Sequence, residues 1–396
     1  MTNLTIAYLA VLTFFTSTVS FAQDSLITEL AKNNVTTFLK AQNTFIGPGW
    51  KIITQQAKKC DNVLIGEEHF TNEIPDFVAA LSVEIKFDNF ITEIDPYSAK
   101  ILETEITNLS TQDFNKYRND FGNTFGFFAL QPEFNLLQQL VKSNTKLFGT
   151  DQISSVADRL ICSKLQKITK NFEAKRIYAI IEDSSKIYFK NFVEGKSNPH
   201  GIPFYMFTNE FQKNLTALSA IELSKEEMLI IDRMKLSAKI YQEQNHQLRI
   251  QLMKNELMKV YSQWEEKKNL FKYGAIHVSK GESFFKIFDI GNVVHNVSDS
   301  KFKNSLHIMV VGKSGSQGSP FKDFPERQID ENSEILKSFK PLFKAVQDKD
   351  WHCIDMLPLR KAVENEKLVV KDITLLRIIN GYDLIVVIPT VTAAKF

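Results

Sequence analysis

Short runs of β-branched and aromatic residues recur along the sequence, and each run ends in polar residues. Patterns typical of helices separate most of these runs. Strands that alternate with helices build a sheet that is largely parallel and covered on both faces. The sequence therefore predicts an α/β fold with a mostly parallel central sheet flanked by helices. The predicted strands are 63–66, 90–94, 146–149, 273–277, 305–311, 351–356 and 383–389.

The middle of the sequence, from about residue 156 to 268, is mostly helical in pattern and rich in charge. Apolar residues between Lys225 and Lys268 recur at helical spacing, which predicts a long helix or a helical hairpin. No Pro/Gly-rich linker marks the boundaries of this region. We therefore predict a single domain over residues 23–396 with a helical insertion or lid at about 156–268. An independent second domain is the alternative.

The first 22 residues have the features of a secretory signal peptide. Residues 6–15 form an apolar stretch too short to span a bilayer comfortably, and Ser20 and Ala22 place small residues just before Gln23. The sequence therefore predicts an exported protein, periplasmic or secreted after cleavage, with an uncleaved N-terminal anchor as the alternative. No later run reaches 18 apolar residues, so we expect no membrane association of the mature chain.

Charge and cysteine content argue against two classes of function. The formal net charge of +2 gives no electrostatic footprint for nucleic acid. The three cysteines, Cys60, Cys162 and Cys353, are widely spaced and form no C-x-x-C motif, so a zinc–cysteine site is not expected. Their number allows at most one disulfide, and we favour buried free thiols.

Carboxylates and imidazoles follow four of the predicted strands. In an open α/β sheet, ligands bind beyond the carboxyl ends of the strands, so these side chains should gather at one rim. The first predicted strand also leads into a helix that Asn72 or Thr71 can cap, with Glu73 in its first turn. The residues at the strand ends are Glu67, Glu68 and His69, then Glu93 and Asp95, then Asp151 and Gln152, and finally His277 and Lys280.

The stretch Gly66–Glu73 (GEEHFTNE) resembles the G-E-x-x-H-[GS]-[TS]-x-E signature of the erythromycin esterase family, with one residue fewer between the glycine and the histidine. The resemblance runs from about residue 55 to the C-terminus. It implies the α/β fold of that family and a hydrolase that acts on ester or amide bonds. Further segments that resemble motifs of the family, in the same order, are Phe90–Glu93, Arg249–Asn255, Gly274–His277, 351–360 and 381–389. The catalytic residues that the resemblance implies are His69, Glu67, Glu73, Glu93, Arg249 and His277.

Besides this spacing, the sequence departs from the family pattern at three places. The family usually has a small residue, often glycine, after the first histidine, where this chain has Phe70. Ile250 replaces the acidic residue after the helix arginine, and the second histidine lies in AIHVSKG without a neighbouring histidine or asparagine. Phe70 would narrow the mouth of the site, so we expect a substrate other than a macrolide. Phe70 and Asp151 are the predicted substrate-binding residues.

The chemistry of this set is that of water activation. A histidine at a strand end, oriented by a carboxylate, can act as a general base, and an arginine or second histidine can stabilise an oxyanion. The set therefore predicts hydrolysis of an ester, lactone or amide, in a small molecule or a peptide, without a serine nucleophile. The sequence contains no G-x-S-x-G elbow, P-loop or H-E-x-x-H motif.

Two other functions stay open. The paired G-x-x-H motifs are also similar to those of a wider superfamily that includes Tiki-type metalloproteases and bacterial haem-binding proteins. The alternatives are therefore a metal-dependent, protease-like hydrolase and a non-catalytic protein that binds haem, iron or another ligand. The nitrogen and oxygen ligands suited to a divalent ion such as Mn, Zn or Fe are His69, His277, Glu67 and Glu93.

Overall fold

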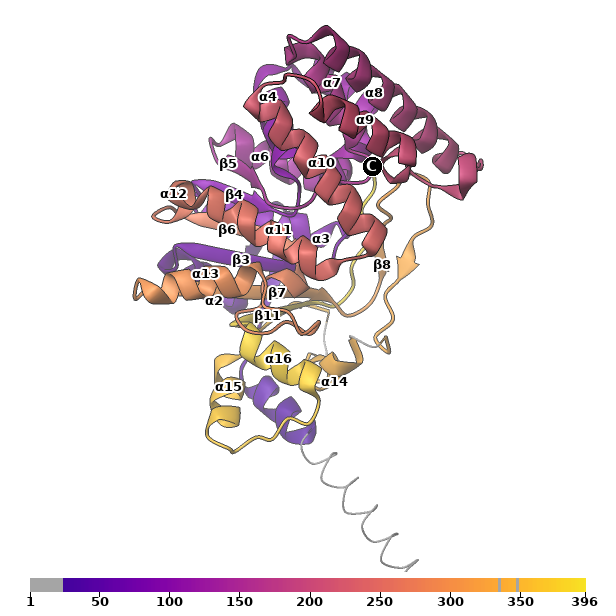
Figure 1. Cartoon of the computed structure of the whole chain (residues 1–396). Helices are drawn as coiled ribbons and strands as arrows, with labels where there is room; N and C mark the ends of the chain where they lie inside the picture. The colour runs from indigo at the N-terminus through magenta and orange to yellow at the C-terminus, as the bar shows by residue number, and fades with distance from the viewer. Residues whose placement is uncertain (1–23, 334–335, 347–348) are drawn as a thin grey trace, which may run out of the picture. The chain divides into compact units, whose positions relative to one another are not determined.

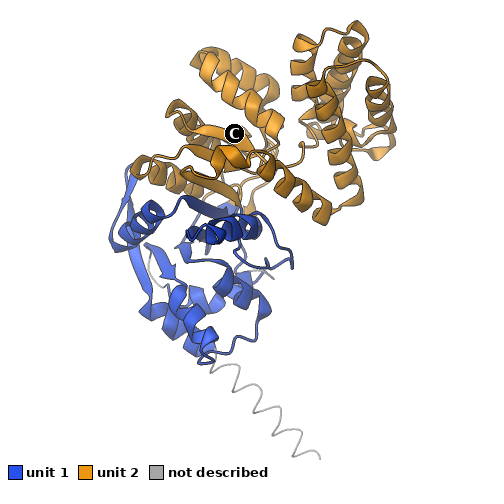
Figure 2. Cartoon of the chain, turned by 60° about the vertical axis from the view of Figure 1, so that its left-hand side comes forward, with its two compact units in different colours: residues 1–68, 274–316, 328–391 blue, residues 69–273, 317–327, 392–396 orange. Residues whose placement is uncertain are grey.

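The computed structural model describes residues 24–333, 336–346 and 349–396. The predicted signal peptide and its cleavage site lie outside the described residues. The chain forms two compact units, each assembled from separate stretches of sequence (Figure 2). Both histidine motifs lie at a boundary between units, which falls after Glu68 and after Tyr273. Unit 1 contains the described part of residues 1–68, with 274–316 and 328–391, and unit 2 contains residues 69–273, 317–327 and 392–396.

The described residues of unit 1 contain six strands in the order β2-β1-β10-β11-β7-β3. Strand β7 pairs in parallel with both β3 and β11, and every residue of these three strands is buried. Their nearly continuous apolar sequences are typical of parallel strands covered on both faces. The other pairs, β2–β1, β1–β10 and β10–β11, are antiparallel. The bounds are β1 (Val35–Ala41), β2 (Thr44–Ile46), β3 (Asn62–Glu67), β7 (Ser305–Gly312), β10 (Trp351–Asp355) and β11 (Leu384–Ile388).

Helices cover this part of the sheet. Helix α2 packs on β1, and α13 packs on β7 and β3. Residues 24–33 are also helical. The remaining bounds in this unit are α2 (Pro48–Lys59), η4 (Ala275–His277), α13 (Ile290–Ser300), η5 (Leu336–Phe339), α14 (Lys340–Phe343), α15 (Leu357–Glu364) and α16 (Ile373–Gly381). The short strands β8 (Ser316–Gln317) and β9 (Arg327–Gln328) lie where the chain passes between units.

Unit 2 contains strands β6 (Asn269–Gly274, except its last residue), β4 (Asn89–Thr92) and β5 (Lys146–Gly149). The central strand β4 pairs in parallel with both neighbours, so the carboxyl ends of β4 and β5 face the same way. Helices α4 and α6 pack on β5. The elements that connect these strands are α3 (Glu73–Glu84), α4 (Pro96–Asn108), α5 (Thr111–Phe121), η1 (Gly122–Ala129) and α6 (Gln131–Lys142).

A long helical segment separates β5 from β6 in the sequence, as predicted (Figure 1). The predicted hairpin is present as α10 and α11, and the chain turns between them at Gln244, whose φ of 49° is left-handed. A capping box of Ser224 and Glu227 fixes the start of α10. The segment contains α7 (Asp158–Ile168), α8 (Phe172–Val193), η2 (Pro199–Gly201), η3 (Tyr205–Phe207), α9 (Asn209–Ser219), α10 (Lys225–Glu243), α11 (His246–Lys259) and α12 (Tyr261–Trp264).

The predicted α/β class is confirmed, with a mainly parallel sheet flanked by helices. One strand was placed wrongly, because β6 covers Asn269–Gly274 while His277 lies in η4. The sequence did not predict the start of this strand because Lys272 interrupts the apolar pattern that is typical of a fully buried strand. Its Nζ lies 2.7 Å from Oε1 of Glu133, and both side chains are 2% exposed, so the buried charge is paired.

Within the part of the chain that the structure describes, no helix combines the length and the apolar character that crossing a bilayer requires.

Candidate functional site

His69 lies in the loop that joins β3 to α3. Its ring stacks on Phe127 with 4.1 Å between centroids and 16° between planes. Phe127 comes from η1, where Gly126 adopts a φ of 58° and a ψ of −130°, a conformation that essentially only glycine tolerates. The glycine kink therefore sets the direction of the ring that supports His69.

The next residue, Phe70, has a φ of 70°. This left-handed conformation costs an L-residue roughly 1–2 kcal/mol, and glycine adopts it freely. Glycine would therefore be the least strained residue at this position. The Phe70 ring lies 5.6 Å from the Phe127 ring and 5.8 Å from the His69 ring, so an aromatic group occupies the space that a glycine would leave open.

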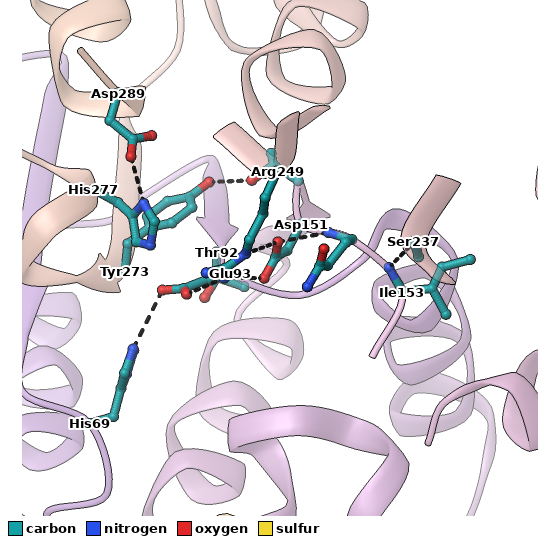
Figure 3. A network of polar contacts seen from close by, with 12 residues as sticks. His69, Thr92, Glu93, Asp151, Ile153, Ser237, Arg249, Tyr273, His277 and Asp289 are labelled. Atoms are coloured by element: carbon teal, nitrogen blue, oxygen red, sulfur yellow. Dashed lines mark hydrogen bonds and ion pairs between the residues drawn. The ribbon is translucent and has the colours of Figure 1, made fainter. Parts of the chain in front are cut away.

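Glu93 follows β4 and lies between His69 and Arg249 (Figure 3). One carboxylate oxygen, Oε2, is 3.5 Å from His69 Nε2, and the other, Oε1, accepts a hydrogen bond of 2.7 Å from Arg249 Nη2. The Glu93 side chain is 5% exposed, whereas that of His69 is 23% exposed. Glu93 is therefore a buried carboxylate whose charge is shared between a guanidinium and an imidazole that water can reach.

Asp151 follows β5 and binds the same arginine. Arg249 donates from Nε to Asp151 Oδ1 at 2.9 Å and from Nη2 to Asp151 Oδ2 at 2.6 Å, a bidentate geometry that fixes the plane of the guanidinium. Burial acts to lower the pKa of Arg249, but Asp151 and Glu93 outweigh it and hold that pKa well above its ordinary value. The arginine thus stays charged and keeps both carboxylates in place.

A third carboxylate, Asp95, lies at the start of α4 close to this group. Its Oδ1 accepts hydrogen bonds from the backbone of Tyr97 and Ser98, while Oδ2 is buried without a hydrogen-bond partner among the described residues. Burial raises the pKa of Asp95 to about 6, and the charge of Asp151 adds to this effect. Gly149 permits the close approach, since a Cβ there would lie 2.5 Å from the Asp95 carbonyl oxygen.

Glu73 lies in the first turn of α3, as predicted, and both of its carboxylate oxygens are bound by Thr392. Its Oε2 accepts from the backbone N–H of Thr392 at 2.9 Å, and its Oε1 accepts from the Thr392 hydroxyl at 2.6 Å. Asn72 occupies the N-cap position of α3 but makes no side-chain capping bond, because its amide donates to Thr392 Oγ1 and the Ala393 carbonyl. Glu73 and Asn72 are therefore engaged with residues near the C-terminus.

The second histidine motif lies in unit 1. His277 Nδ1 is 2.7 Å from Asp289 Oδ2, and the two side chains are only 2% and 3% exposed (Figure 3). Asp289 also accepts from the backbone N–H of Ile290 at the start of α13, which fixes its position. A carboxylate that holds one ring nitrogen sets the tautomer of the histidine, as in hydrolases that use a histidine base.

Close packing explains why the first G-x-x-H motif has a glycine at position 66. A Cβ on Gly66 would lie 2.5 Å from Val278 Cγ2 and 3.0 Å from Ala275 Cα, so the turn of the second motif packs directly on β3 in unit 1. Glu67 ends β3 and is 4% exposed, and Glu68 Oε2 lies 3.3 Å from the backbone N–H of Gly312.

Lys280 was expected at the carboxyl rim of the sheet but does not lie there. It pairs with Asp383 at 2.6 Å, and Asp383 immediately precedes β11, at the amino end of that strand. The loop after His277 therefore runs back toward the opposite edge of the strands in unit 1.

Cys60, Cys162 and Cys353 are buried free thiols, as favoured from their spacing. Burial raises the pKa of the Cys162 thiol well above its ordinary value, so it is not a reactive nucleophile. Among the residues that the structure describes, no group of three or more histidine, cysteine, aspartate or glutamate side chains is arranged to hold a metal ion.

Two residues that contact the predicted histidines, one in each unit, could not be found from the sequence. Phe127 was part of an aromatic stretch whose rings are mostly buried, and only the left-handed Gly126 singles it out. Asp289 lies 12 residues after His277 in a loop, and nothing in the local sequence distinguishes it from a helix cap. Both contacts depend on tertiary structure.

Comparison with known proteins supports the fold. No protein-family profile matches the sequence, and no curated protein matches it. Three solved structures share the fold over nearly the whole chain, at identities that carry no further conclusion. A Bacillus cereus protein has a TM-score of 0.53 at 15% identity, covering 94% of this chain and 98% of its own. A succinoglycan biosynthesis protein has a TM-score of 0.54 at 14% identity, covering 94% of this chain and 99% of its own. A mutant of the erythromycin esterase EreC in its open conformation has a TM-score of 0.53 at 15% identity, covering 90% of this chain and 98% of its own.

Proposed function

We infer that this protein is an exported hydrolase that uses water activated by His69 to cleave an ester, lactone or amide. The observation that carries the inference is the chain of contacts from His69 through Glu93 to Arg249 and Asp151. A buried carboxylate next to a partly exposed histidine is the arrangement of a general base and its orienting group. The fold that it shares with an erythromycin esterase supports a hydrolytic reaction on this scaffold.

In this reaction the His69 imidazole takes a proton from water as the water attacks the substrate carbonyl. Glu93 stabilises the imidazolium that forms, because its Oε2 faces Nε2 of the histidine. Arg249 holds the Glu93 carboxylate in place through its other oxygen. The separation of 3.5 Å between His69 and Glu93 is longer than a hydrogen bond, and we expect it to shorten when substrate binds.

Two aromatic rings define the substrate class further. Phe127 covers one face of the His69 ring, and Phe70 extends the apolar surface beside it. An acyl or alcohol group with an apolar or aromatic portion would contact these rings while its carbonyl approaches the imidazole. The site therefore favours esters, lactones or amides with such a portion, and not large polar macrolides.

The test is turnover on a panel of aryl esters, lactones and short peptides by the chain without its first 22 residues. His69→Asn should lower kcat/KM by about 10²-fold or more. His200→Asn, at an exposed histidine that already has a left-handed φ, should leave it unchanged. The absence of turnover on every member of the panel would refute the hydrolase.

The same preparation separates the two alternatives. Activity that survives a chelator supports activation of water by His69 alone, whereas loss in chelator and recovery with one divalent ion supports the metal-dependent hydrolase. A Soret band on titration with haem, without turnover, supports the ligand-binding protein.

A further inference from the structure

Residues Thr392–Lys395, which we call the C-terminal clamp, lie along the loop that carries His69. The carbonyl oxygen of Phe70 accepts two backbone hydrogen bonds, from Ala394 at 2.9 Å and from Gly318 at 2.8 Å. One residue further, Thr71 and Ala393 form an antiparallel bridge, and Asn72 donates to the Thr392 carbonyl at 3.0 Å.

The clamp also contacts the element that supports His69 from the other side. The Lys395 carbonyl accepts a hydrogen bond of 2.7 Å from the backbone N–H of Gln131, the first residue of α6. Helix α6 follows directly after η1, which carries Phe127. The clamp therefore ties together the two backbone segments whose side chains, His69 and Phe127, stack on each other.

A strained backbone needs such support. Phe70 is held in a left-handed conformation that a phenylalanine avoids, and its carbonyl is the group that receives two donors. Gly318 is required for this approach, since a Cβ there would lie 2.3 Å from the Ala394 carbonyl oxygen. The clamp thus offsets the cost of placing a large residue directly after His69.

We propose that Glu73 is a positioning residue that acts through Thr392, so that the C-terminal clamp holds His69 in its reactive position. Both oxygens of Glu73 are used by Thr392, one through the backbone N–H and one through the hydroxyl. This role rests on the proposed function of His69 and replaces a direct catalytic role for Glu73.

The test is a double-mutant cycle with Glu73→Ala and Thr392→Val, read by amide hydrogen exchange at Asn72 and Ala394. Each single variant should lower the protection of these amides about tenfold, because they report the opening of the clamp. Both substitutions remove the hydrogen bond between Glu73 Oε1 and the Thr392 hydroxyl, so the double variant should lose less protection than the two single losses combined. Glu73→Gln should restore most of the protection, and Glu84→Ala, at the other end of α3, should have no effect.

Turnover gives the second readout. Both single variants should lower kcat about tenfold with little change in KM, and the double variant should match them. Effects that multiply in the double variant, or a loss of kcat in Glu73→Ala without any loss of protection at Asn72 and Ala394, would overturn the positioning role. Thr392→Val keeps the volume of the side chain and the backbone bond to Glu73 Oε2, so unchanged exchange in both folded single variants also overturns the proposal. If the panel reveals no hydrolysis at all, the exchange data still decide whether the clamp exists.

Discussion

Nη2 of Arg249 lies 2.7 Å from Oε1 of Glu93, and the same nitrogen lies 2.6 Å from Oδ2 of Asp151. One cation therefore serves two carboxylates that come from the ends of two adjacent parallel strands. The guanidinium suits this task better than an ammonium because it presents several donors in one plane.

Arg249→Met should destabilise the protein by about 2–4 kcal/mol, since it leaves two largely buried carboxylates without their cation. The loss should be smaller than for a fully enclosed pair, because the Arg249 side chain is 20% exposed. Urea unfolding measures the effect. Arg176→Met is the matched control, as it removes an exposed pair with Glu173, and no change is expected there. Equal losses in the two variants would contradict a structural role for the Arg249 cluster.

Phe70→Gly should be more stable than Phe70→Ala by about 1 kcal/mol, because only glycine relieves the left-handed strain. Both variants lose the same ring contacts, so the difference between their free energies of unfolding reports the cost of the left-handed backbone. Phe324 does not have a positive φ, so we expect the opposite order of stability for its glycine and alanine variants. There alanine should be the more stable, since glycine gains more freedom in the unfolded chain. Thermal unfolding of the four variants shows whether the order inverts between the two sites.

Asp289→Asn should lower kcat/KM by about 10²-fold or more while the fold stays intact. Asparagine caps α13 as well as aspartate does, but its amide can hold His277 in the wrong tautomer and cannot stabilise an imidazolium. Steady-state kinetics with circular dichroism distinguish these effects. Asp372→Asn, at the N-cap of α16, tests the capping role alone and should leave activity unchanged. Full activity in Asp289→Asn would refute a catalytic role for His277.

Asp95→Asn should change how stability depends on pH. The pKa of Asp95 rises from 3.8 to about 6 on folding, so the folded protein binds a proton that the unfolded chain has already released between these values. The contribution of Asp95 to stability therefore falls as pH rises from about 4 to 6, and its full cost is present above pH 6. Asparagine removes this cost and keeps the cap on α4, giving a gain of up to about 3 kcal/mol at pH 7. Denaturant midpoints from pH 4 to 8 test the prediction, and a difference that does not vary with pH would refute it.

Much of the unit 2 site could be predicted from the sequence, because strand ends and acidic residues are both visible there. Glu93 and Asp151 were expected among the side chains that gather at one rim of the sheet, and in the structure both bind Arg249. Helical periodicity alone does not say which face of α11 turns inward, so the convergence of Arg249 depended on the family resemblance.

The failures have physical causes as well. The sequence misplaced β6 because Lys272 interrupts its apolar pattern. The buried charge of this lysine is paired with Glu133 of α6, which is far away in the sequence. The bonds of Glu73 to Thr392 join residues 319 apart, a pairing that no local pattern encodes. A left-handed Phe70 is equally invisible, because its cost is met by hydrogen bonds to Gly318 and Ala394.

The position of Arg249 on α11 also governs when the site can form during synthesis. Glu93 precedes Arg249 by 156 residues, so the carboxylate leaves the ribosome roughly 10–30 s before its cation at ordinary elongation rates. During that interval Glu93 and Asp151 cannot be buried without a partner, and the ends of β4 and β5 must stay hydrated. A nascent chain that ends before α11 therefore cannot pair Glu93 and Asp151 with Arg249.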